Sequence, residues 1–429
     1  MRSFGARLAA VLTPLIVFAS FLCLVTPRVT VAALVVFSLV IISLALLEGA
    51  RLRDLVRPDL GLWLFLATTV YLFINATWSA DMDRAINKAA LFILFAVLTL
   101  GTARAIFTWP EERAKRAGAA FAIGVALGGL YLLIEVLTDQ ALARWFFNLL
   151  PALRPDDKGM VLEDGEILSI RIAELNRGIA LLLMSLWPLM LYLTGRRRGW
   201  PSWAVGTALF ALAAYVILAS DHNTSQIAIF VSLVAFLATY ALPRPAWLAL
   251  TAAWCLSFVA VLPLAIFAYQ ADLHKAEWLP YSARARIVLW SYTAHVVPKT
   301  PVLGIGGSSS RALASEPEAI AKAKEAQKQG KVYAWWAGPH AHNEYLQSWY
   351  ELGVTGVVLL MVCGAWVLWA MGRLPRGQLP YMVAHFAAFA TLSASAWGMW
   401  QTWLMALPGL AVIYGAIALR ATQEASPES

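Results

Sequence analysis

The amino-acid sequence predicts an all-α polytopic membrane protein with about 12 transmembrane helices, and three observations lead to this fold class. The 429 residues are 60% hydrophobic and only 14% charged, and their mean hydropathy is +0.68. Soluble domains usually carry about 25% charged residues, so burial in one soluble core cannot account for this composition. Apolar runs of about 20 residues, long enough to cross a bilayer, recur along the chain. Basic residues gather in every second connection between these runs.

The apolar runs give the helix count. The first run follows a basic start and resembles a signal peptide, but another run begins almost at once, at about Val29. We therefore interpret the first run as an uncleaved transmembrane helix. The 19 tryptophans suit this fold class, because indole rings favour the headgroup level of a membrane. The expected spans are residues 8–26, 29–48, 60–78, 87–106, 118–138, 178–195, 202–219, 226–242, 246–269, 351–371, 380–397 and 399–419.

Lysine and arginine in the short connections give the orientation, since these residues favour the cytoplasmic side of a membrane. One side of the twelve-span arrangement carries a coherent basic set, and one missed helix would scramble it. We expect this side to be the cytoplasm, with both termini inside. The basic residues are Arg2, Arg7, Arg51, Arg53, Arg57, Arg113, Lys115, Arg116, Arg196, Arg197, Arg198, Arg244, Arg373, Arg376 and Arg420.

The opposite side carries two long connections, at about 139–177 and about 270–350. In a Gram-negative bacterium this side of the inner membrane faces the periplasm. The second connection contains the amphipathic stretch "PYSARARIVLWSYTAHVVP" and a polar helix that we expect to end at Gly330, so it should be a folded, helical loop. The expected division is residues 1–269 for helices 1–9, 270–350 for the large periplasmic loop with active-site residues, 351–419 for helices 10–12, and 420–429 for a cytoplasmic tail.

The first of four candidate clusters on the outer side is "YSARARIVLW", which contains Arg284 and Arg286. On a helix, Arg286 and Trp290 are four residues apart and share a face. With Trp290 at the membrane interface, Arg286 would point at a lipid headgroup. Ordinary loop charge, or contact with anionic lipid, is the alternative.

The second cluster is the glycine-containing stretch "PVLGIGGSSSR". Its glycines, Gly304, Gly306 and Gly307, allow a tight turn whose exposed N–H groups can bind anionic oxygens. It is not a nucleotide-binding P-loop, because the lysine and its spacing are absent. A purely structural turn is the alternative.

The third cluster is "PHAHNEYLQSWYELGVTG", from Pro339 to Gly356. A helix that begins at about His342–Asn343 would place His342 at the boundary between membrane and water. Gly353 and Gly356 would then share a face that a neighbouring helix could approach closely. The two histidines lack the spacing and the nearby cysteine of a zinc motif, so we expect no metal here. A structural interfacial histidine is the alternative.

The fourth cluster pairs Arg177 with His222, which both lie where short segments meet the outer face. Helix caps and interfacial anchors are the alternative interpretation. Together, the four clusters indicate a cavity at the outer membrane surface that contains several arginines and a histidine. A lipid with a strongly anionic head, such as a polyprenyl pyrophosphate, fits it best, because arginine forks bind phosphate oxygens. Histidine suits proton transfer near neutral pH.

Three stretches of the sequence carry a resemblance to a known family. They are "RIVLW" from Arg286 to Trp290, "PKTPVLGIGG" from Pro298 to Gly307, and "HNEYLQSWYELGVTG" from His342 to Gly356. The last has a histidine, then asparagine, nine residues, and Gly-x-x-Gly. The chain thereby resembles the bacterial O-antigen ligase and O-antigen polymerase superfamily, specifically over about residues 281–358 and elsewhere in its twelve-span layout.

The resemblance implies an inverting lipid-to-lipid glycosyltransferase of the GT-C type in the bacterial inner membrane. The donor would be O-antigen glycan on undecaprenyl pyrophosphate, and the acceptor a sugar hydroxyl of the lipid A–core oligosaccharide, on the periplasmic face. Such ligases need no nucleotide and are thought to need no metal, so we expect no cofactor. The sequence agrees in lacking an Asp-x-Asp pair and a glycine-rich nucleotide motif on the cytoplasmic side.

The resemblance also implies residue roles. His342 matches the family's essential histidine and is expected to be the general base, and Arg286 matches the loop arginine that binds pyrophosphate. Many relatives carry Ser-Arg where this sequence has Ser220, Asp221 and His222. The second pyrophosphate-binding arginine is therefore expected elsewhere, with Arg177 the first choice and Arg284 the second. The expected supporting residues are His340, Asn343, His222 and Trp290.

Other functions remain alternatives. An O-antigen polymerase would use the same donor with a second lipid-linked glycan as acceptor, and a protein O-oligosaccharyltransferase of the same superfamily is also compatible. A lipid-linked glycan transporter belongs to a different class. It would favour repeated halves and polar groups along a path at the membrane midplane. The sequence instead gathers its polar residues at one surface, which favours an enzyme.

Overall fold

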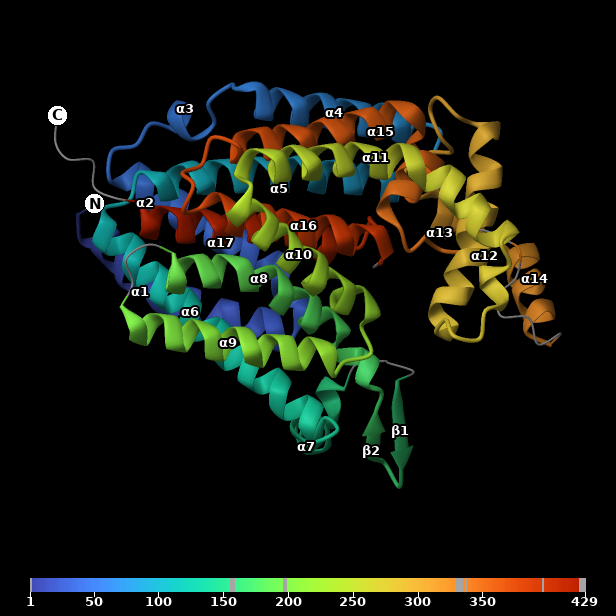
Figure 1. Ribbon diagram of the computed structural model, residues 1–429, viewed down its shortest axis with the longest axis horizontal. Coiled ribbons are helices and arrows are strands. Elements are labelled where there is room, and N and C mark those ends of the chain that lie inside the picture. Colours follow the sequence, from blue (N-terminus) through green and yellow to red (C-terminus); the bar gives the residue numbers. More distant parts are fainter. Residues whose placement is uncertain are drawn as a thin grey trace.

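The computed structural model describes residues 2–154, 159–195, 199–328, 335, 338–395 and 397–423, and within these ranges the chain is an all-α polytopic membrane protein with one short hairpin. The predicted fold class is confirmed. Twelve long helices run side by side in one bundle (Figure 1). They are α1 (Arg2–Val25), α2 (Thr30–Leu47), α4 (Leu60–Ala76), α5 (Met82–Phe107), α6 (Glu111–Leu137), α8 (Asn176–Thr194), α9 (Trp200–Leu218), α10 (Asn223–Ala241), α11 (Pro243–Gln270), α15 (Glu344–Met371), α16 (Leu379–Ser395) and α17 (Thr402–Thr422).

Each long helix coincides with one predicted span. For most helix ends, the observed and predicted bounds differ by only a few residues. Within the described residues, ten of the twelve are long and apolar enough to cross a membrane by length and composition. The other two, α4 and α16, are 17 residues each. The largest differences lie at α6 and α15, which each begin seven residues before the predicted starts at 118 and 351. Asn343 caps α15 at its earlier start.

The connections hold the short elements. The helical ones are η1 (Pro27–Val29), α3 (Leu52–Leu55), α7 (Ala141–Leu149), η2 (Pro151–Leu153), η3 (Ile172–Leu175), η4 (Leu273–Lys275), α12 (Tyr281–Val296), η5 (Val297–Lys299), α13 (Ser309–Ala314) and α14 (Pro317–Lys328). Strands β1 (Met160–Glu163) and β2 (Glu166–Ile170) pair antiparallel, with Met160 opposite Ile170 and a register shift between Val161 and Leu162. The large loop is helical as predicted, and Gly330, the expected end of its polar helix, lies outside the described residues.

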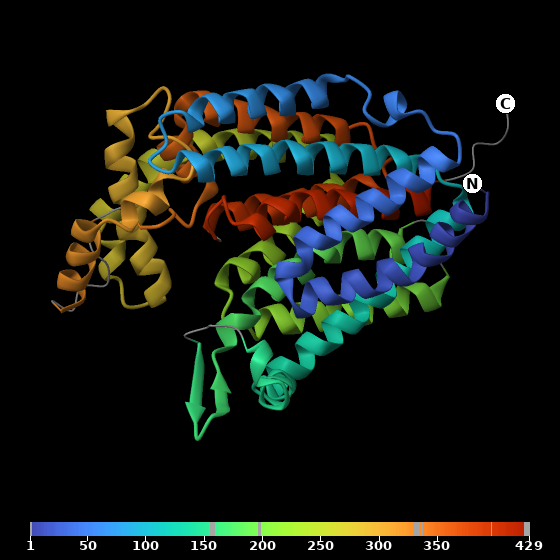
Figure 2. The same ribbon diagram turned by 180° about the vertical axis from the view of Figure 1, so that it is seen from behind.

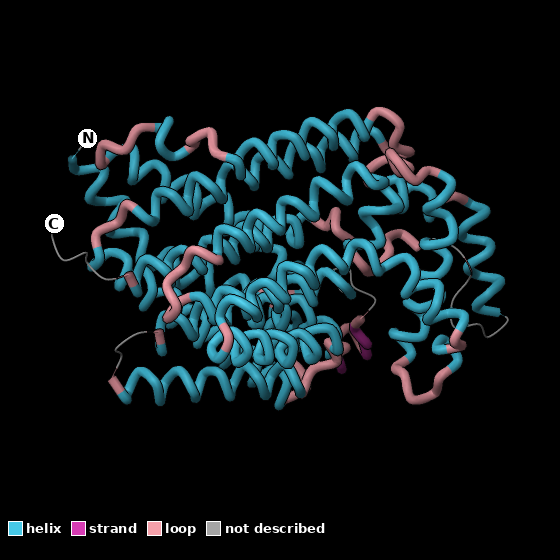
Figure 3. Tube along the Cα trace, turned by 45° about the horizontal axis from the view of Figure 1, so that its top comes forward, coloured by secondary structure: helices cyan, strands magenta, loops and turns pink. Residues whose placement is uncertain are grey.

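The two ends of the bundle differ. The start of α1, the end of α17 and the short helix α3 lie at one end, which we call the arginine end (Figure 1). Helix α7, the β-hairpin and helices α12 to α14 lie at the other, which we call the loop end. Arg196, Arg197 and Arg198 of the predicted basic set lie outside the described residues. Seen from behind and with the top tilted forward, the long helices keep this common direction (Figures 2 and 3).

Helices α8 and α17 form the centre of the bundle. In the apolar 18-residue stretch of α8, 94% of the residues are buried, and in the corresponding stretch of α17, 78% are buried. By contrast, only 17% of the residues in the corresponding stretch of α11 are buried, so α11 is a peripheral helix with a wide apolar face. In a membrane such a face meets lipid, whereas the buried helices rely on close packing against their neighbours.

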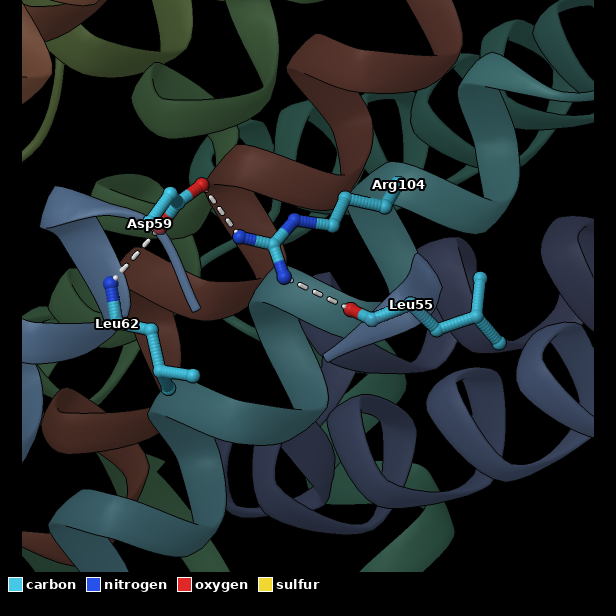
Figure 4. A network of polar contacts seen from close by, with 4 residues as sticks. All are labelled: Leu55, Asp59, Leu62 and Arg104. Carbon is cyan, nitrogen blue, oxygen red and sulfur yellow. Dashed lines mark hydrogen bonds and ion pairs between the residues drawn. The ribbon is translucent and has the colours of Figure 1, made fainter. Parts of the chain in front are cut away.

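At the arginine end, one polar network joins two helices (Figure 4). Asp59 caps α4 by accepting a 3.0 Å hydrogen bond from Leu62 N. The guanidinium of Arg104, near the end of α5, donates to Asp59 Oδ2 over 2.5 Å and to the Leu55 carbonyl over 3.0 Å. The start of α4 is thereby tied to the end of α5 through one arginine.

Helix α15 is broken at Gly353. This residue has φ 61° and ψ −170°, a conformation that is essentially restricted to glycine. A Cβ at Gly353 would lie 2.5 Å from the carbonyl carbon and oxygen of Val302. The prediction that Gly353 and Gly356 form a face for a neighbouring helix is therefore wrong. The close partner is the loop backbone at Val302–Gly304, and Gly356 faces Leu352 of its own helix.

The break frees backbone groups that the surrounding chain satisfies. Ile305 N donates to the Tyr350 carbonyl and Val354 N to the Pro301 carbonyl, over 3.0 and 2.8 Å. From α4, the Tyr71 hydroxyl donates to the Leu352 carbonyl over 2.5 Å, and Asn75 Nδ2 donates to the Leu303 carbonyl over 2.9 Å. Non-helical backbone is tolerated at membrane depth only when it is buried and satisfied in this way.

The break leads to a first prediction. Gly353→Ala should lower the apparent melting temperature of the detergent-solubilised protein, because alanine at this φ and ψ costs about 1–3 kcal/mol before any steric clash. Thermal unfolding followed by size-exclusion chromatography measures this. Gly101→Ala is the matched control, since Gly101 lies in a regular part of α5 and its nearest new contact is the side-chain end of Ile42. Equal melting temperatures for the two variants would contradict the proposed constraint.

Candidate functional site

A cavity of about 850 Å³ lies at the loop end, where the starts of several long helices meet the large loop. Its lining contains five basic residues and, among the described residues, one carboxylate. The basic residues come from the α1–α2 connection, α5, α8 and α13. The lining is Arg28, Val31, Arg84, Lys88, Arg177, Ser308, Arg311, Ala314, Ser315, Pro339, His340, Gln347, Glu351, Gly398, Trp400, Gln401, Thr402 and Trp403.

Local structure explains how α5 presents its two basic residues. Asp81 caps the helix by accepting a 3.1 Å hydrogen bond from Arg84 N. Arg84 and Lys88 are then one turn apart on one face. The buried Lys88 ammonium donates to Thr402 Oγ1, at the start of α17, over 2.8 Å. This contact fixes the position of a cation between two spanning helices.

The one carboxylate of the lining, that of Glu351, already holds the glycine-containing turn. Its Oε2 accepts from Ser308 N over 3.0 Å and from the Trp400 indole. Its Oε1 accepts from Ser310 N over 3.0 Å and from the Ser310 hydroxyl over 2.5 Å. Of the two interpretations, an anion-binding turn and a structural turn, the structure favours the second, since the N–H groups of the turn bind a side chain of the protein itself. The remaining charge of the cavity is strongly positive.

Several polar atoms of the cavity lining are buried without a hydrogen-bond partner among the described residues. They are Nε of Arg84, Nε of Arg177, Oγ of Ser308 and Nε2 of His340. Buried polar groups are normally paired, so such unpaired atoms at a cavity suit a polar ligand. Together with the five basic residues they favour an anion that has several oxygens.

His340 contributes to the cavity wall, and His342 lies beside it at the edge. The two rings are 4.1 Å apart between centroids. His340 packs against Gly398, where a Cβ would come within 2.6 Å of the His340 Cβ. Burial, and then the nearby His342, Arg311 and Arg286, lower the pKa of His340 to about 3. His340 is therefore neutral at physiological pH.

His342 is half-buried and has a left-handed backbone, with φ 52°. The next residue, Asn343, begins α15 as predicted, because its Oδ1 accepts a 3.0 Å hydrogen bond from Leu346 N. The His340–His342 segment is also held from α12, since the Trp290 indole donates to the Ala341 carbonyl over 2.8 Å. Trp290 thus supports the histidine segment directly.

Helix α12 also brings Arg286 to this corner. Arg286 Nη1 donates to Ser395 Oγ, at the end of α16, over 3.3 Å. The Ser395 carbonyl accepts from Thr224 of α10 over 3.0 Å, so one residue joins three helices. Arg284 is two residues earlier on α12, and neither it nor Arg286 is among the described residues that line the cavity.

His222 is buried next to the same corner. Its ring stacks on Trp397 with 4.8 Å between centroids, and its Nδ1 lies 2.6 Å from Ser225 Oγ. Burial, and then the charge of Arg286, lower the pKa of His222 to about 4. The structure therefore gathers His340, His342, Asn343, Trp290, Arg286 and His222 at one corner, while Arg177 lies in the lining of the adjacent cavity.

Four basic residues of the cavity were missed by sequence reasoning: Arg28, Arg84, Lys88 and Arg311. A signal for three of them was present. Arg28, Arg84 and Lys88 lie at or beside the short connections of the loop end, where the charge rule predicts few basic residues, so they are exceptions to that rule. Arg311 ends the glycine-containing stretch that was singled out for its backbone alone.

The lowered pKa of His340 leads to a second prediction. In the unfolded chain this histidine binds a proton near pH 6.5, and in the folded protein only near pH 3, so stability rises with pH between these values. We expect the apparent melting temperature to fall between about pH 7.5 and about pH 5.5, and to fall less in His340→Gln. Equal falls for the two proteins would exclude a buried neutral His340.

Comparisons with known proteins show similarity to one family over part of the chain. The family model described as O-antigen ligase matches residues 208–361, which include α12, the glycine-containing turn and the histidine segment. A protein of Rickettsia conorii named "Putative polysaccharide ligase" is 23% identical over 343 residues, which cover 78% of this chain and 74% of the relative. One of the same name from Rickettsia felis is 24% identical over 238 residues, covering 53% of this chain and 54% of the relative. Over residues 208–361, this membrane protein is therefore similar to the O-antigen ligase family, as the resemblance of its large loop predicts.

Proposed function

We propose that this protein moves an O-antigen glycan from undecaprenyl pyrophosphate to a sugar hydroxyl of the lipid A–core oligosaccharide, which completes lipopolysaccharide. The observation that carries the proposal is the cavity with five basic residues beside two histidines, at one end of a membrane-spanning bundle. A ligand for it needs several anionic oxygens, and a pyrophosphate on a lipid carrier supplies these at membrane depth. The family match adds the reaction class.

The donor pyrophosphate is proposed to lie between Arg286 and Arg177, with Arg311, Arg84 and Lys88 adding to the positive field. Arginine can bind two phosphate oxygens at once, which fixes the orientation of the leaving group. Negative charge grows on that group as the reaction proceeds, so fixed cations stabilise the transition state more than the ground state. Arg284 remains a second choice for this role, because it sits on α12 two residues from Arg286.

The proposed chemical step is direct displacement. The acceptor oxygen bonds to the anomeric carbon, and the bond from that carbon to the pyrophosphate oxygen breaks. The pyrophosphate keeps the bonding electrons, and the hydroxyl proton passes to His342 as general base. One displacement inverts the anomeric centre. The residues supporting this arrangement are Asn343, which caps α15, Trp290, which holds Ala341, and His340 and His222, which flank the site.

The proposed location is a bacterial inner membrane, with the arginine end and both termini in the cytoplasm and the loop end in the periplasm. The large loop at about 270–350 is then the periplasmic part that carries active-site residues. We propose that the protein is a glycosyltransferase of the GT-C type. No cofactor is proposed, since the step balances with donor, acceptor and protein groups.

A reconstitution experiment tests the proposal. The purified protein is combined with undecaprenyl pyrophosphate-linked glycan and lipid A–core in liposomes. Glycan-bearing lipid A–core supports the ligase. Longer glycan on the polyprenyl carrier indicates a polymerase, glycan on an added acceptor protein indicates an oligosaccharyltransferase, and lipid crossing the bilayer without product indicates a transporter.

The histidine and the loop arginine give the third prediction. His342→Ala should abolish transfer while the protein remains folded and membrane-inserted. Arg286→Ala should do much the same, since one charge-assisted contact in a dry site contributes several kcal/mol. Arg286→Lys should restore only part of the activity, because lysine keeps the charge but loses the fork. Wild-type transfer by the His342 variant would remove its catalytic role.

The cavity gives the fourth prediction. Arg311→Ala and Arg84→Ala should each raise the KM for the lipid pyrophosphate donor about tenfold, the effect of losing one charge-assisted hydrogen bond. Steady-state rates at varied donor concentration measure this. Arg53→Ala is the matched control, because Arg53 is an exposed arginine at the opposite end of the bundle. A donor KM that stays unchanged in both cavity variants would place the pyrophosphate elsewhere.

A further inference from the structure

Helix α7 leaves the bundle at a sharp turn after α6. Asp139 and Gln140 both have positive φ, 51° and 59°, and the chain changes direction sharply at these two residues. Glu135, in the last turn of α6, secures the turn by accepting a 3.0 Å hydrogen bond from Ala143 N. In Figure 2 α7 is seen nearly end-on while the long helices run across the picture, so its axis is roughly perpendicular to the bundle.

The outer face of α7 is apolar and exposed. Leu142, Trp145, Phe146, Leu149 and Leu150 follow the spacing of one helix face, and all five are exposed. Trp145 is the most exposed of them, at 65%. A contiguous exposed patch of large apolar side chains marks a surface that meets a partner or a membrane.

The opposite face of α7 holds the β-hairpin through polar groups. Arg144 Nη1 donates to the Leu168 carbonyl over 2.8 Å, and Asn148 Oδ1 accepts from Ile167 N over 2.8 Å. Arg154 adds a 2.7 Å hydrogen bond to the Gly165 carbonyl in the hairpin turn. Because its polar residues are committed to the hairpin, α7 has a fixed rotation that leaves the apolar face outward.

We infer that α7 lies flat in the outer surface of the membrane, with its apolar face among lipid chains. Three observations select lipid over a protein partner. The helix is perpendicular to the spanning bundle and joined directly to the end of α6. The exposed leucines of α6, Leu127, Leu130 and Leu137, extend an apolar surface up to the turn. Trp145 is the side chain that favours the headgroup level.

The hairpin turn marks the side that stays in water. It carries the exposed carboxylates of Glu163, Asp164 and Glu166. Beyond β2 the chain passes through η3 into α8, where Arg177 lines the cavity. Gln140 Nε2 ties the start of α7 to this path by donating to the Ile170 carbonyl over 2.7 Å. The membrane-bound helix therefore also sets the depth of Arg177, whatever ligand the cavity holds.

Spin labelling in lipid nanodiscs tests the inference. Cysteine is introduced as Trp145→Cys or Leu149→Cys in the full chain with Cys23, Cys255 and Cys363 replaced by alanine, and Asp164→Cys is the matched control. Labels at 145 and 149 should collide more with oxygen, which concentrates in lipid, than with a water-soluble nickel chelate. The label at 164 should show the reverse order. Nickel accessibility at 145 equal to that at 164 would overturn the inference, as would shielding of 145 from both reagents, which indicates a protein partner.

A second measurement needs no cysteine and covers failure of the cysteine-free background to fold. The emission of wild type minus that of Trp145→Phe isolates Trp145. In nanodiscs of brominated phosphatidylcholine this difference emission should be strongly quenched relative to nanodiscs of the unbrominated lipid. Equal difference emission in the two lipids would overturn the inference. Neither measurement involves glycan transfer, so the outcome is separate from that of the proposed function.

Discussion

The attachment of the glycine-containing turn to the broken helix α15 is the constraint on which the loop end depends. Gly353 allows the break, and the Val302–Gly304 backbone fills the space that a side chain would occupy. Two residues earlier, the buried Glu351 accepts hydrogen bonds from Ser308, Ser310 and Trp400. The turn then carries α13, and with it Arg311, to the cavity wall. The same helix is capped by Asn343 at its start, and the two histidines lie directly before this cap. One helix therefore positions both the cavity wall that carries Arg311 and the histidine corner at which we propose proton transfer.

Charge balance explains why this end needs so much internal bonding. Five basic residues around one cavity repel each other, and the single carboxylate in the described lining is occupied by donors. The bundle limits the cost by anchoring the cations separately: Lys88 to Thr402, and Arg286 to Ser395 at the adjacent corner. Burial keeps His340 neutral by lowering its pKa, and the nearby His342, Arg311 and Arg286 add to this effect. A neutral imidazole next to fixed cations can exchange hydrogen bonds with a hydroxyl while the cations hold an anion.

The helices of the bundle could be predicted from the sequence, but the lining of the cavity could not, and there is a physical reason for this difference. Membrane spans depend on long apolar runs, which are local, so all twelve helices could be predicted, as could a helix start near Asn343. The break at Gly353 depends on a backbone contact with Val302, some fifty residues away, and a glycine face was predicted instead. The lining of the cavity combines residues as distant as Arg28 and Thr402. No spacing rule relates such residues, although the resemblance to a family did select the histidine and arginine of the adjacent corner.

Basic residues serve two different purposes in this protein, and burial distinguishes them. At the arginine end, residues such as Arg53 are exposed and contribute to topology through their number. At the loop end, Lys88 is 9% exposed and bonded across two helices, so its position matters and not only its charge. A basic residue in a short connection at the loop end opposes the topological rule, and the fold keeps it only if something offsets that cost. Binding an anionic substrate is an adequate reason, so Arg28, Arg84 and Lys88 are functional candidates because they break the charge pattern from which the orientation is predicted.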